Sequence, residues 1–103
     1  MRPGNAMGDD TPVVVVFRRW KAKPHTLIAL FPTLPATHDG RYCMSYEHVG
    51  QHGGADYRGV LRRSVRVTQP EAEKDGLYNE LLRIGYKLDV RMLFSNHWKR
   101  EVR

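Results

Sequence analysis

The sequence predicts an α+β fold, in which a mixed or antiparallel sheet of four to five strands carries one helix on one face. Three observations lead to this prediction. The first half of the chain contains β-branched and apolar runs separated by prolines and glycines. Residues 68–85 carry the signals that start and end a helix, and residues 86–94 alternate apolar and polar side chains, which predicts a strand with one buried face. The expected order along the chain is β-β-β-β-α-β, which packs most simply as a helix on one face of a sheet.

Two strands are expected close to the N-terminus. Residues 13–17 form an uninterrupted β-branched and apolar run after Pro12, which indicates a strand buried on both faces. Residues 26–31 form a second apolar run and predict its hairpin partner. Because proline cannot donate a hydrogen bond to a sheet ladder, the two prolines in residues 32–40 predict an irregular loop there.

The central part of the chain predicts two further strands. Residues 41–47 can form a short strand, with Cys43 facing one way and Tyr46 the other. Residues 48–56 contain three glycines, which disfavour a helix, so a structured loop is expected. Residues 57–67 predict a fourth strand with a bend or bulge partway along it.

The helix is the best-specified element and is expected at about residues 70–84. Thr68 can cap its N-terminus, Pro70 suits its first turn, and Glu71 completes a capping box. Gly85 predicts its C-terminal end. An apolar stripe at helical spacing, which would face the sheet, is formed by Leu77, Leu81 and Ile84.

The length of 103 residues fits a single domain, which we place at residues 12–94. Residues 1–11 are expected to be a disordered N-terminal tail and residues 95–103 a basic C-terminal tail. The longest apolar run, residues 13–17, is far shorter than the about 20 residues needed to cross a bilayer. With a single cysteine, which fits a reducing compartment, this predicts a cytoplasmic protein without a membrane partner.

The charge balance indicates an anionic partner. The chain has 17 Lys and Arg against 11 Asp and Glu, giving a net charge of +6. An excess of this sign favours nucleic acid or an acidic protein surface. The simpler interpretation is solubility, because a net charge of about 2–8 is ordinary for a small domain.

Residues 42–57 hold the densest mixture of chemically useful side chains, and a metal site is the first candidate there. Cys43, His48, His52 and Asp56 all have side chains that can bind zinc. The glycines among them argue against the helix that would bring the two histidines to one face. Histidines that hydrogen-bond to the backbone of a glycine-rich turn explain the pattern equally well. The sequence therefore predicts no metal and no cofactor.

Nucleophilic catalysis and phosphate binding are the other candidates in this segment. Cys43 or Ser45 could be activated by a neighbouring histidine, but strand alternation puts both on the face opposite Tyr46 and His48. Residues 50–54 could form an anion-binding turn, although the lysine and helix of a P-loop do not follow them. No catalytic residue is assigned, and an enzyme is not the leading expectation.

Nucleic-acid binding accounts for more of the chain than these local sites. Basic residues cluster at the first hairpin, where Lys21 and Lys23 follow two arginines, and again in residues 58–66. If these segments are neighbours, they form a basic stripe suited to a phosphate backbone, and aromatic side chains could stack on unpaired bases. No established nucleic-acid-binding motif is present, so we expect low sequence specificity. The candidate binding residues are Arg18, Arg19, Trp20, Tyr46, His48, Gln51, His52, Asp56, Tyr57, Arg62, Arg63 and Arg66.

Other interpretations of the same residues stay open. A solvated sheet face with aromatic residues in the core would produce the same pattern without nucleic-acid binding. The alternative function is a protein-interaction module, such as an inhibitor or modulator of a host or defence nucleoprotein complex. A third is a small metal-binding protein or enzyme that uses residues 43–57.

Three sequence patterns resemble those of a known family. They are F-R-x-W at residues 17–20, A-L-F-P at residues 29–32 and C-x-S-Y-x-H-x-G-Q-H-G-x-A-D-Y at residues 43–57. Together they resemble a family of small, functionally uncharacterised bacterial proteins that are often carried on plasmids, prophages and other mobile elements. The resemblance covers roughly residues 13–92. It implies an accessory protein of mobile DNA or of its host, and it assigns no catalytic residues.

Overall fold

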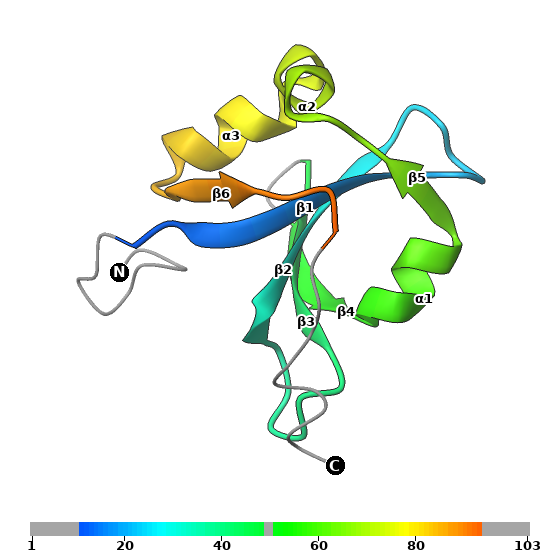
Figure 1. Cartoon of the computed structure of the whole chain (residues 1–103), viewed down its shortest axis with the longest axis vertical. Coiled ribbons are helices and arrows are strands. Elements are labelled where there is room, and N and C mark those ends of the chain that lie inside the picture. The colour runs from blue at the N-terminus through cyan, green and yellow to red at the C-terminus, as the bar shows by residue number, and fades with distance from the viewer. Residues whose placement is uncertain (1–10, 49–50, 94–103) are drawn as a thin grey trace.

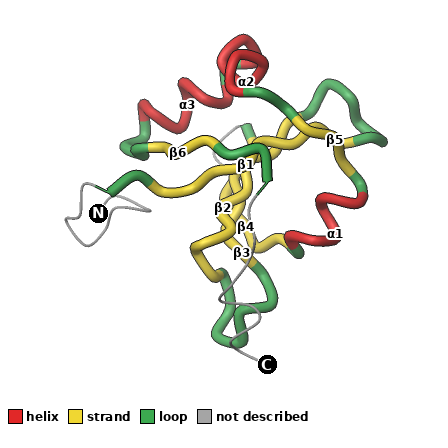
Figure 2. The backbone as a smooth tube through the Cα atoms, viewed as in Figure 1, coloured by secondary structure: helices red, strands yellow, loops and turns green. Residues whose placement is uncertain are grey.

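The computed structural model describes residues 11–48 and 51–93, and in these ranges the chain forms six strands and three helices (Figures 1 and 2). The strands are β1 (Val13–Trp20), β2 (Leu27–Pro35), β3 (Cys43–Glu47), β4 (Gln51–Ala55), β5 (Ser64–Arg66) and β6 (Leu88–Val90). The helices are α1 (Tyr57–Arg62), α2 (Gln69–Asp75) and α3 (Leu77–Arg83). A mixed sheet with these helices fits the expected α+β class, but the order is β-β-β-β-α-β-α-α-β.

β1 is the central strand of the sheet. It pairs antiparallel with β2, with Val16 opposite Leu30, which confirms the predicted first hairpin. β5 pairs antiparallel with the C-terminal part of β1, at residues 18–20, and β6 pairs parallel with its N-terminal part, at residues 13–15 (Figure 1). β3 pairs with β2 and β4 with β3, so the sheet order is β4-β3-β2-β1-β5.

Helices cover both faces of the sheet, rather than one face as expected. α2 and α3 pack on one face, where Phe17, Phe31 and Leu81 belong to one buried cluster. α1 packs on the other face, where Val16 and Val60 belong to a second cluster. Because side chains alternate along a strand, β1 supplies both clusters, which confirms the prediction that it is buried on both faces.

The single helix predicted at about 70–84 is two helices. The backbone of Gly76 has a φ of 100°, a left-handed conformation that ends α2 and starts α3. The capping box of Thr68 and Glu71 is present as predicted, and Gly85, with a φ of 112°, follows the end of α3. The predicted apolar stripe is correct for Leu77 and Leu81, whereas Ile84 is 40% exposed.

Two predictions for the central segment are wrong. The expected loop at residues 48–56 contains β4, because the glycine-rich backbone pairs with all five residues of β3. The expected strand at residues 57–67 starts as the helix α1, because Tyr57 and Val60 lie three residues apart and bury one helical face against the sheet. Only residues 64–66 of this segment form a strand.

The ends of two other elements also differ from the prediction. β2 continues to Pro35 through the expected loop, with a register shift between Phe31 and Pro35 that accommodates its prolines. The last strand is confined to β6, beyond which Met92 is 38% exposed. The described residues do not include Phe94 or the predicted C-terminal tail at 95–103. Of the predicted N-terminal tail at 1–11, they include only Thr11. In the described ranges, no helix has the length and apolar character needed to span a bilayer.

Candidate functional site

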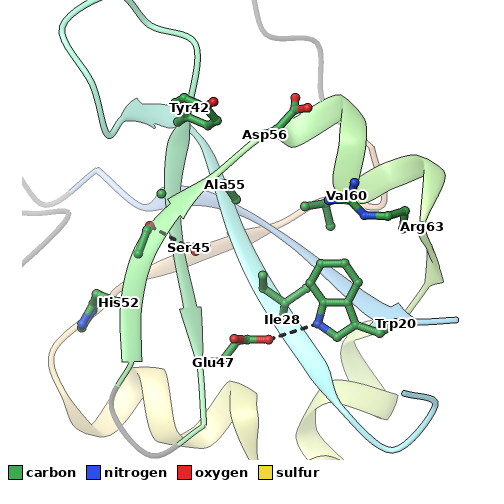
Figure 3. Close-up of a pocket in the computed structure, with 12 residues that line it drawn as sticks. Trp20, Ile28, Tyr42, Ser45, Glu47, His52, Ala55, Asp56, Val60 and Arg63 are labelled. Atoms are coloured by element: carbon green, nitrogen blue, oxygen red, sulfur yellow. Dashed lines mark hydrogen bonds between the residues drawn. The ribbon is translucent and has the colours of Figure 1, made fainter. Parts of the chain in front are cut away.

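The side chain of Trp20 marks the most open part of the α1 side of the sheet. Its indole N–H donates a hydrogen bond to Glu47 Oε2 at 3.0 Å, which links the end of β1 to the end of β3 (Figure 3). The guanidinium carbon of Arg63, at the C-terminus of α1, lies 6.0 Å from the centroid of the Trp20 ring. This distance is within the range of a cation–π contact.

Two hollows meet at these three side chains. The first, which we call the α1 hollow, has a volume of about 460 Å³ and lies between α1 and strands β3 and β4 (Figure 3). The second, which we call the hairpin hollow, has a volume of about 550 Å³ and lies beside the β1–β2 connection. The α1 hollow is also lined by Ile28, Tyr42, Ser45, His52, Gly53, Gly54, Ala55, Asp56 and Val60. The hairpin hollow is also lined by Ala22, Lys23, Thr26 and His48.

A glycine on β4 keeps the α1 hollow open. Gly53 pairs with Ser45, so the two positions lie on the same face of the sheet. The Ser45 hydroxyl donates to the Gly53 carbonyl oxygen at 3.1 Å. A Cβ atom at Gly53 would meet Ser45 Oγ at 3.8 Å, an ordinary contact, so a larger side chain could extend into the hollow without displacing the backbone.

Exposed cationic side chains surround this region, and we call them the cationic rim: Lys21, Lys23, Arg58, Arg62 and Arg63. The Lys21 ammonium donates to the Arg62 carbonyl oxygen at 3.1 Å, and the Lys21 backbone N–H donates to the Arg63 carbonyl oxygen at 3.0 Å. These bonds bring the start of the β1–β2 connection to the end of α1. Within residues 11–48 and 51–93, no member of the rim forms a salt bridge with a carboxylate.

A second group of polar side chains lies on the α2–α3 side of the sheet. His48 Nδ1 lies 2.7 Å from Glu80 Oε1, and His48 Nε2 lies 2.6 Å from Asp75 Oδ2. The Tyr46 hydroxyl donates to the other oxygen of Glu80. We call Tyr46, His48, Asp75 and Glu80 the carboxylate clamp, because it joins the end of β3 to both helices.

The clamp favours the doubly protonated form of its histidine. A carboxylate can only accept hydrogen bonds, so a ring that bonds to one carboxylate through each nitrogen must donate from both. Burial opposes the charge, but the hydrogen bonds to Asp75 and Glu80 outweigh it and raise the pKa of His48 above its usual value. Hydrogen bonds from Tyr46 and His48 in turn lower the pKa of the Glu80 carboxyl. The imidazolium offsets the charge of one carboxylate, so the clamp with both carboxylates ionised keeps a net negative charge.

His52 belongs to the same side as the clamp. Its ring packs edge-on against Tyr46, with centroids 4.7 Å apart, and its Nε2 atom lies 3.2 Å from the Tyr86 hydroxyl. Figure 3 shows this ring pointing away from the α1 hollow. Burial raises the pKa of the Tyr86 hydroxyl.

The structure divides the predicted binding residues into three groups. Trp20, Asp56 and Arg63 line the α1 hollow and Arg62 is the last residue of α1, whereas the rings of Tyr46, His48 and His52 come together on the opposite side of the sheet. The third group comprises Arg18, Arg19, Gln51, Tyr57 and Arg66, which lie in the core or at other places on the sheet.

Arg18 is the clearest departure from the expected basic surface. It is only 7% exposed, and its guanidinium donates to the Ser64 hydroxyl, the Ser64 carbonyl and the Leu61 carbonyl at 2.8–3.0 Å. Burial lowers its pKa. Its role is to hold the end of α1 on β1. Tyr57 is also buried, as part of the core under α1.

The remaining predicted residues occupy separate positions. Arg19 forms a salt bridge with Glu71 at 3.2 Å, on the α2 side. Arg66 is exposed on β5, opposite Arg18 in the ladder, and Gln51 is the first residue of β4.

Sequence reasoning did not identify three functional partners. Glu47 binds Trp20 across 27 positions of the chain, and Asp75 and Glu80 bind His48 across 27 and 32 positions. No local pattern in the sequence connects residues at such separations.

The fold disperses the residues that were weighed as a metal or nucleophile cluster. Cys43 is buried in the core on the α1 side, whereas His48 and His52 lie on the α2–α3 side. In the described part of the chain, no group of three or more His, Cys, Asp or Glu side chains is arranged to hold a metal ion. Cys43 and Ser45 also face away from both histidines, as strand alternation predicts.

Comparison with known proteins adds no further assignment. No protein-family model, curated protein or solved structure matches this chain.

Proposed function

We propose that this protein binds nucleic acid with low sequence specificity through the cationic rim beside Trp20. The observation that carries the proposal is the convergence of five exposed cations from two separate parts of the chain. Arg63 and Lys23 line the hollows that the partly exposed Trp20 also lines, and none of the five cations is neutralised by a salt bridge within the described residues. Phosphates supply most of the affinity in non-specific binding, and lysine and arginine are their usual partners.

The distribution of acidic residues supports this surface over the rest of the sheet. α2 carries Glu71, Glu73 and Asp75, and α3 carries Glu80. A polyanion that approached this side would meet these carboxylates, two of which already compensate His48. The α1 side therefore offers the more favourable electrostatic approach for a phosphate backbone.

The cellular role that we propose follows from the same binding. A nucleic-acid partner is compatible with the cytoplasmic location and the accessory role in mobile DNA that the sequence led us to expect. The alternative is the protein-interaction module, and one observation favours it: Leu82 and Ile84 are each at least 40% exposed at the end of α3. A protein partner would use this apolar patch, and its affinity would respond weakly to salt.

The proposal is tested by fluorescence anisotropy with labelled single- and double-stranded oligonucleotides at 50 and 200 mM salt. We expect binding that weakens steeply with salt. The paired substitution Arg62→Ala and Arg63→Ala should weaken binding and make the slope of log K against log salt shallower by about 1.4 for single strands. Both side chains are exposed, so the fold should be retained.

The matched control removes the same two charges from the α2–α3 side, by Lys74→Ala with Arg83→Ala. Both of these side chains are exposed as well. The control should bind nearly as the unmodified protein does. Equal losses in the two double variants would show that only net charge matters, and absence of binding at 50 mM salt would remove nucleic acid as the partner.

A further inference from the structure

The interior of the α1 hollow has a different chemistry from the cationic rim around it. Its floor is apolar, formed by Ile28, Ala55 and Val60. Two acidic residues, Glu47 and Asp56, line it; Figure 3 shows the Glu47 carboxylate beside Trp20, whereas the Asp56 carboxylate lies at the start of α1 and points away from Trp20. A phosphate group would be attracted to the rim but repelled from the interior.

Trp20 provides a flat aromatic wall to this hollow. Its indole is fixed in place by the hydrogen bond to Glu47, so little rotamer freedom is lost when a ligand packs against it. Aromatic walls of this kind stack on the bases of single strands, which every base permits because each has a π-face. The volume of about 460 Å³ falls within the range of small-ligand pockets.

A cationic ligand is the competing occupant, because tryptophan and carboxylates together also attract cations. Here the guanidinium of Arg63 already lies 6.0 Å from the Trp20 ring centroid. This is the outer limit of a cation–π contact, and at that distance the guanidinium would repel a second positive charge near the indole. A neutral, planar ligand with hydrogen-bond donors fits the hollow better.

We propose that the α1 hollow takes one unpaired nucleobase of a single strand, stacked on Trp20, and that it prefers guanine to thymine or uracil. This inference rests on the proposed function. The Glu47 carboxylate can only accept hydrogen bonds when ionised. Guanine presents two adjacent donors, its ring N–H and its amino group, to one carboxylate. Thymine and uracil present one N–H between two carbonyl oxygens, which a carboxylate repels.

The arrangement also explains how the rim and the hollow would act together. Phosphates on either side of the inserted base would contact rim residues such as Arg62 and Lys23, while the base enters the hollow. Base pairing hides the donors of guanine and keeps the base in the stack. The preference should therefore appear with single strands and be lost in duplexes.

The experiment compares two labelled oligonucleotides, oligo-dT and oligo-dT with one central dG, each long enough to stay annealed to its complement at 50 mM salt in the duplex measurements. A single guanine avoids self-association of the probe. At 50 mM salt, the dG-containing single strand should bind at least about fivefold more tightly than oligo-dT, and the two duplexes should bind equally.

Two substitutions locate the preference in the hollow. Gly53→Val places a side chain in the hollow without changing any charge, and valine suits a strand. It should abolish the preference for dG while leaving the salt-dependent affinity for oligo-dT within about twofold. Glu47→Gln keeps an oxygen that can accept from Trp20 and converts part of the carboxylate into a donor. Glu47→Gln should reduce the preference at least threefold. It therefore still tests the inference if Gly53→Val proves unstable in thermal unfolding.

The outcomes separate this inference from the proposed function. Salt-dependent binding of oligo-dT with no preference for dG overturns the base pocket and leaves the phosphate-binding function in place. A preference that survives Glu47→Gln, or Gly53→Val in folded protein, also overturns it. No binding of any probe at 50 mM salt overturns the proposed function and the inference together.

Discussion

Replacing His48 by glutamine tests the carboxylate clamp most directly. Glutamine can keep one hydrogen bond, but it carries no charge and cannot reach both Asp75 and Glu80 as the imidazolium does. Hydrogen bonds to charged groups contribute about 1.5–3 kcal/mol each, and fully exposed ion pairs about 0.2–1 kcal/mol. The His48 side chain is 39% exposed while its partners are 19–23% exposed, so values near the lower end apply. We expect a loss of about 1–2 kcal/mol in the free energy of unfolding near pH 6.

The pH dependence of this loss has a definite sign. The pKa of His48 is raised in the folded state, so its stabilisation is complete below its unfolded pKa of about 6.5 and is lost as the pH rises through the folded value. The pKa of Glu80 is lowered, so its contribution is present above its unfolded value of about 4.3 and is lost as the pH falls through the folded value. The difference between the two proteins should therefore be largest between about pH 4.5 and 6.5.

Urea unfolding followed by circular dichroism at pH 6 and pH 8.5 measures this effect. The control is His38→Gln, which changes an exposed histidine in the β2–β3 connection and should leave stability unchanged at both pH values. A loss for His48→Gln that is equal at pH 6 and pH 8.5 would contradict the charged clamp. A loss below about 0.3 kcal/mol at pH 6 would show that its hydrogen bonds contribute nothing measurable.

Other substitutions test the remaining features of the fold. Gly76→Ala should cost about 1 kcal/mol in calorimetric unfolding, because its φ of 100° strains a residue with a Cβ, although open space surrounds that position; an unchanged melting temperature would exclude this strain. Arg18→Met should cost at least about 2 kcal/mol in urea unfolding, because the Ser64 and Leu61 carbonyl oxygens lose buried donors; a loss under 1 kcal/mol would mean that water replaces the guanidinium. Cys43, which is 1% exposed, should react with a thiol reagent slowly in the native protein and rapidly in urea; fast native reaction would show that β3 opens.

The elements that the sequence predicts correctly are those with local signals. The hairpin of β1 and β2 follows from two apolar runs with a proline-containing turn between them. The capping box at Thr68 and the stop at Gly85 each depend on residues within four positions. The opposite orientations of Cys43 and Tyr46 follow from strand alternation alone.

The errors occur where partners that are distant in the sequence decide the local structure. Glycines normally weaken a strand, yet Gly53 and Gly54 belong to β4 because β3 supplies a complete ladder. The start of the predicted fourth strand forms α1 because Tyr57 and Val60 find an apolar sheet face to cover. The break at Gly76 could have been predicted, since glycine inside a helical pattern is a recognised end signal.

The candidate site was predictable in composition but not in arrangement. The arginines and Trp20 were identified from the sequence, but their division between core and surface depends on the fold. Arg18 and Arg63 illustrate this. Arg18 follows the apolar run of β1 and is buried, whereas Arg63 follows α1 and is exposed. The histidines that stood out as chemical candidates have structural partners in Asp75, Glu80 and Tyr86.

Substitutions on the two sides of the sheet should have separable effects on stability and on nucleic-acid affinity. On the α2–α3 side, His48 and its carboxylates satisfy one another, so changes there should alter stability and leave nucleic-acid affinity nearly constant. On the α1 side, Arg62 and Arg63 carry exposed charges that no described carboxylate pairs with, so changes there should alter affinity and leave stability nearly constant. Measuring stability and nucleic-acid affinity for the variants on each side tests this assignment. If a folded variant of His48 weakened nucleic-acid binding as much as the arginine pair does, the assignment of the binding surface to the α1 side would be wrong.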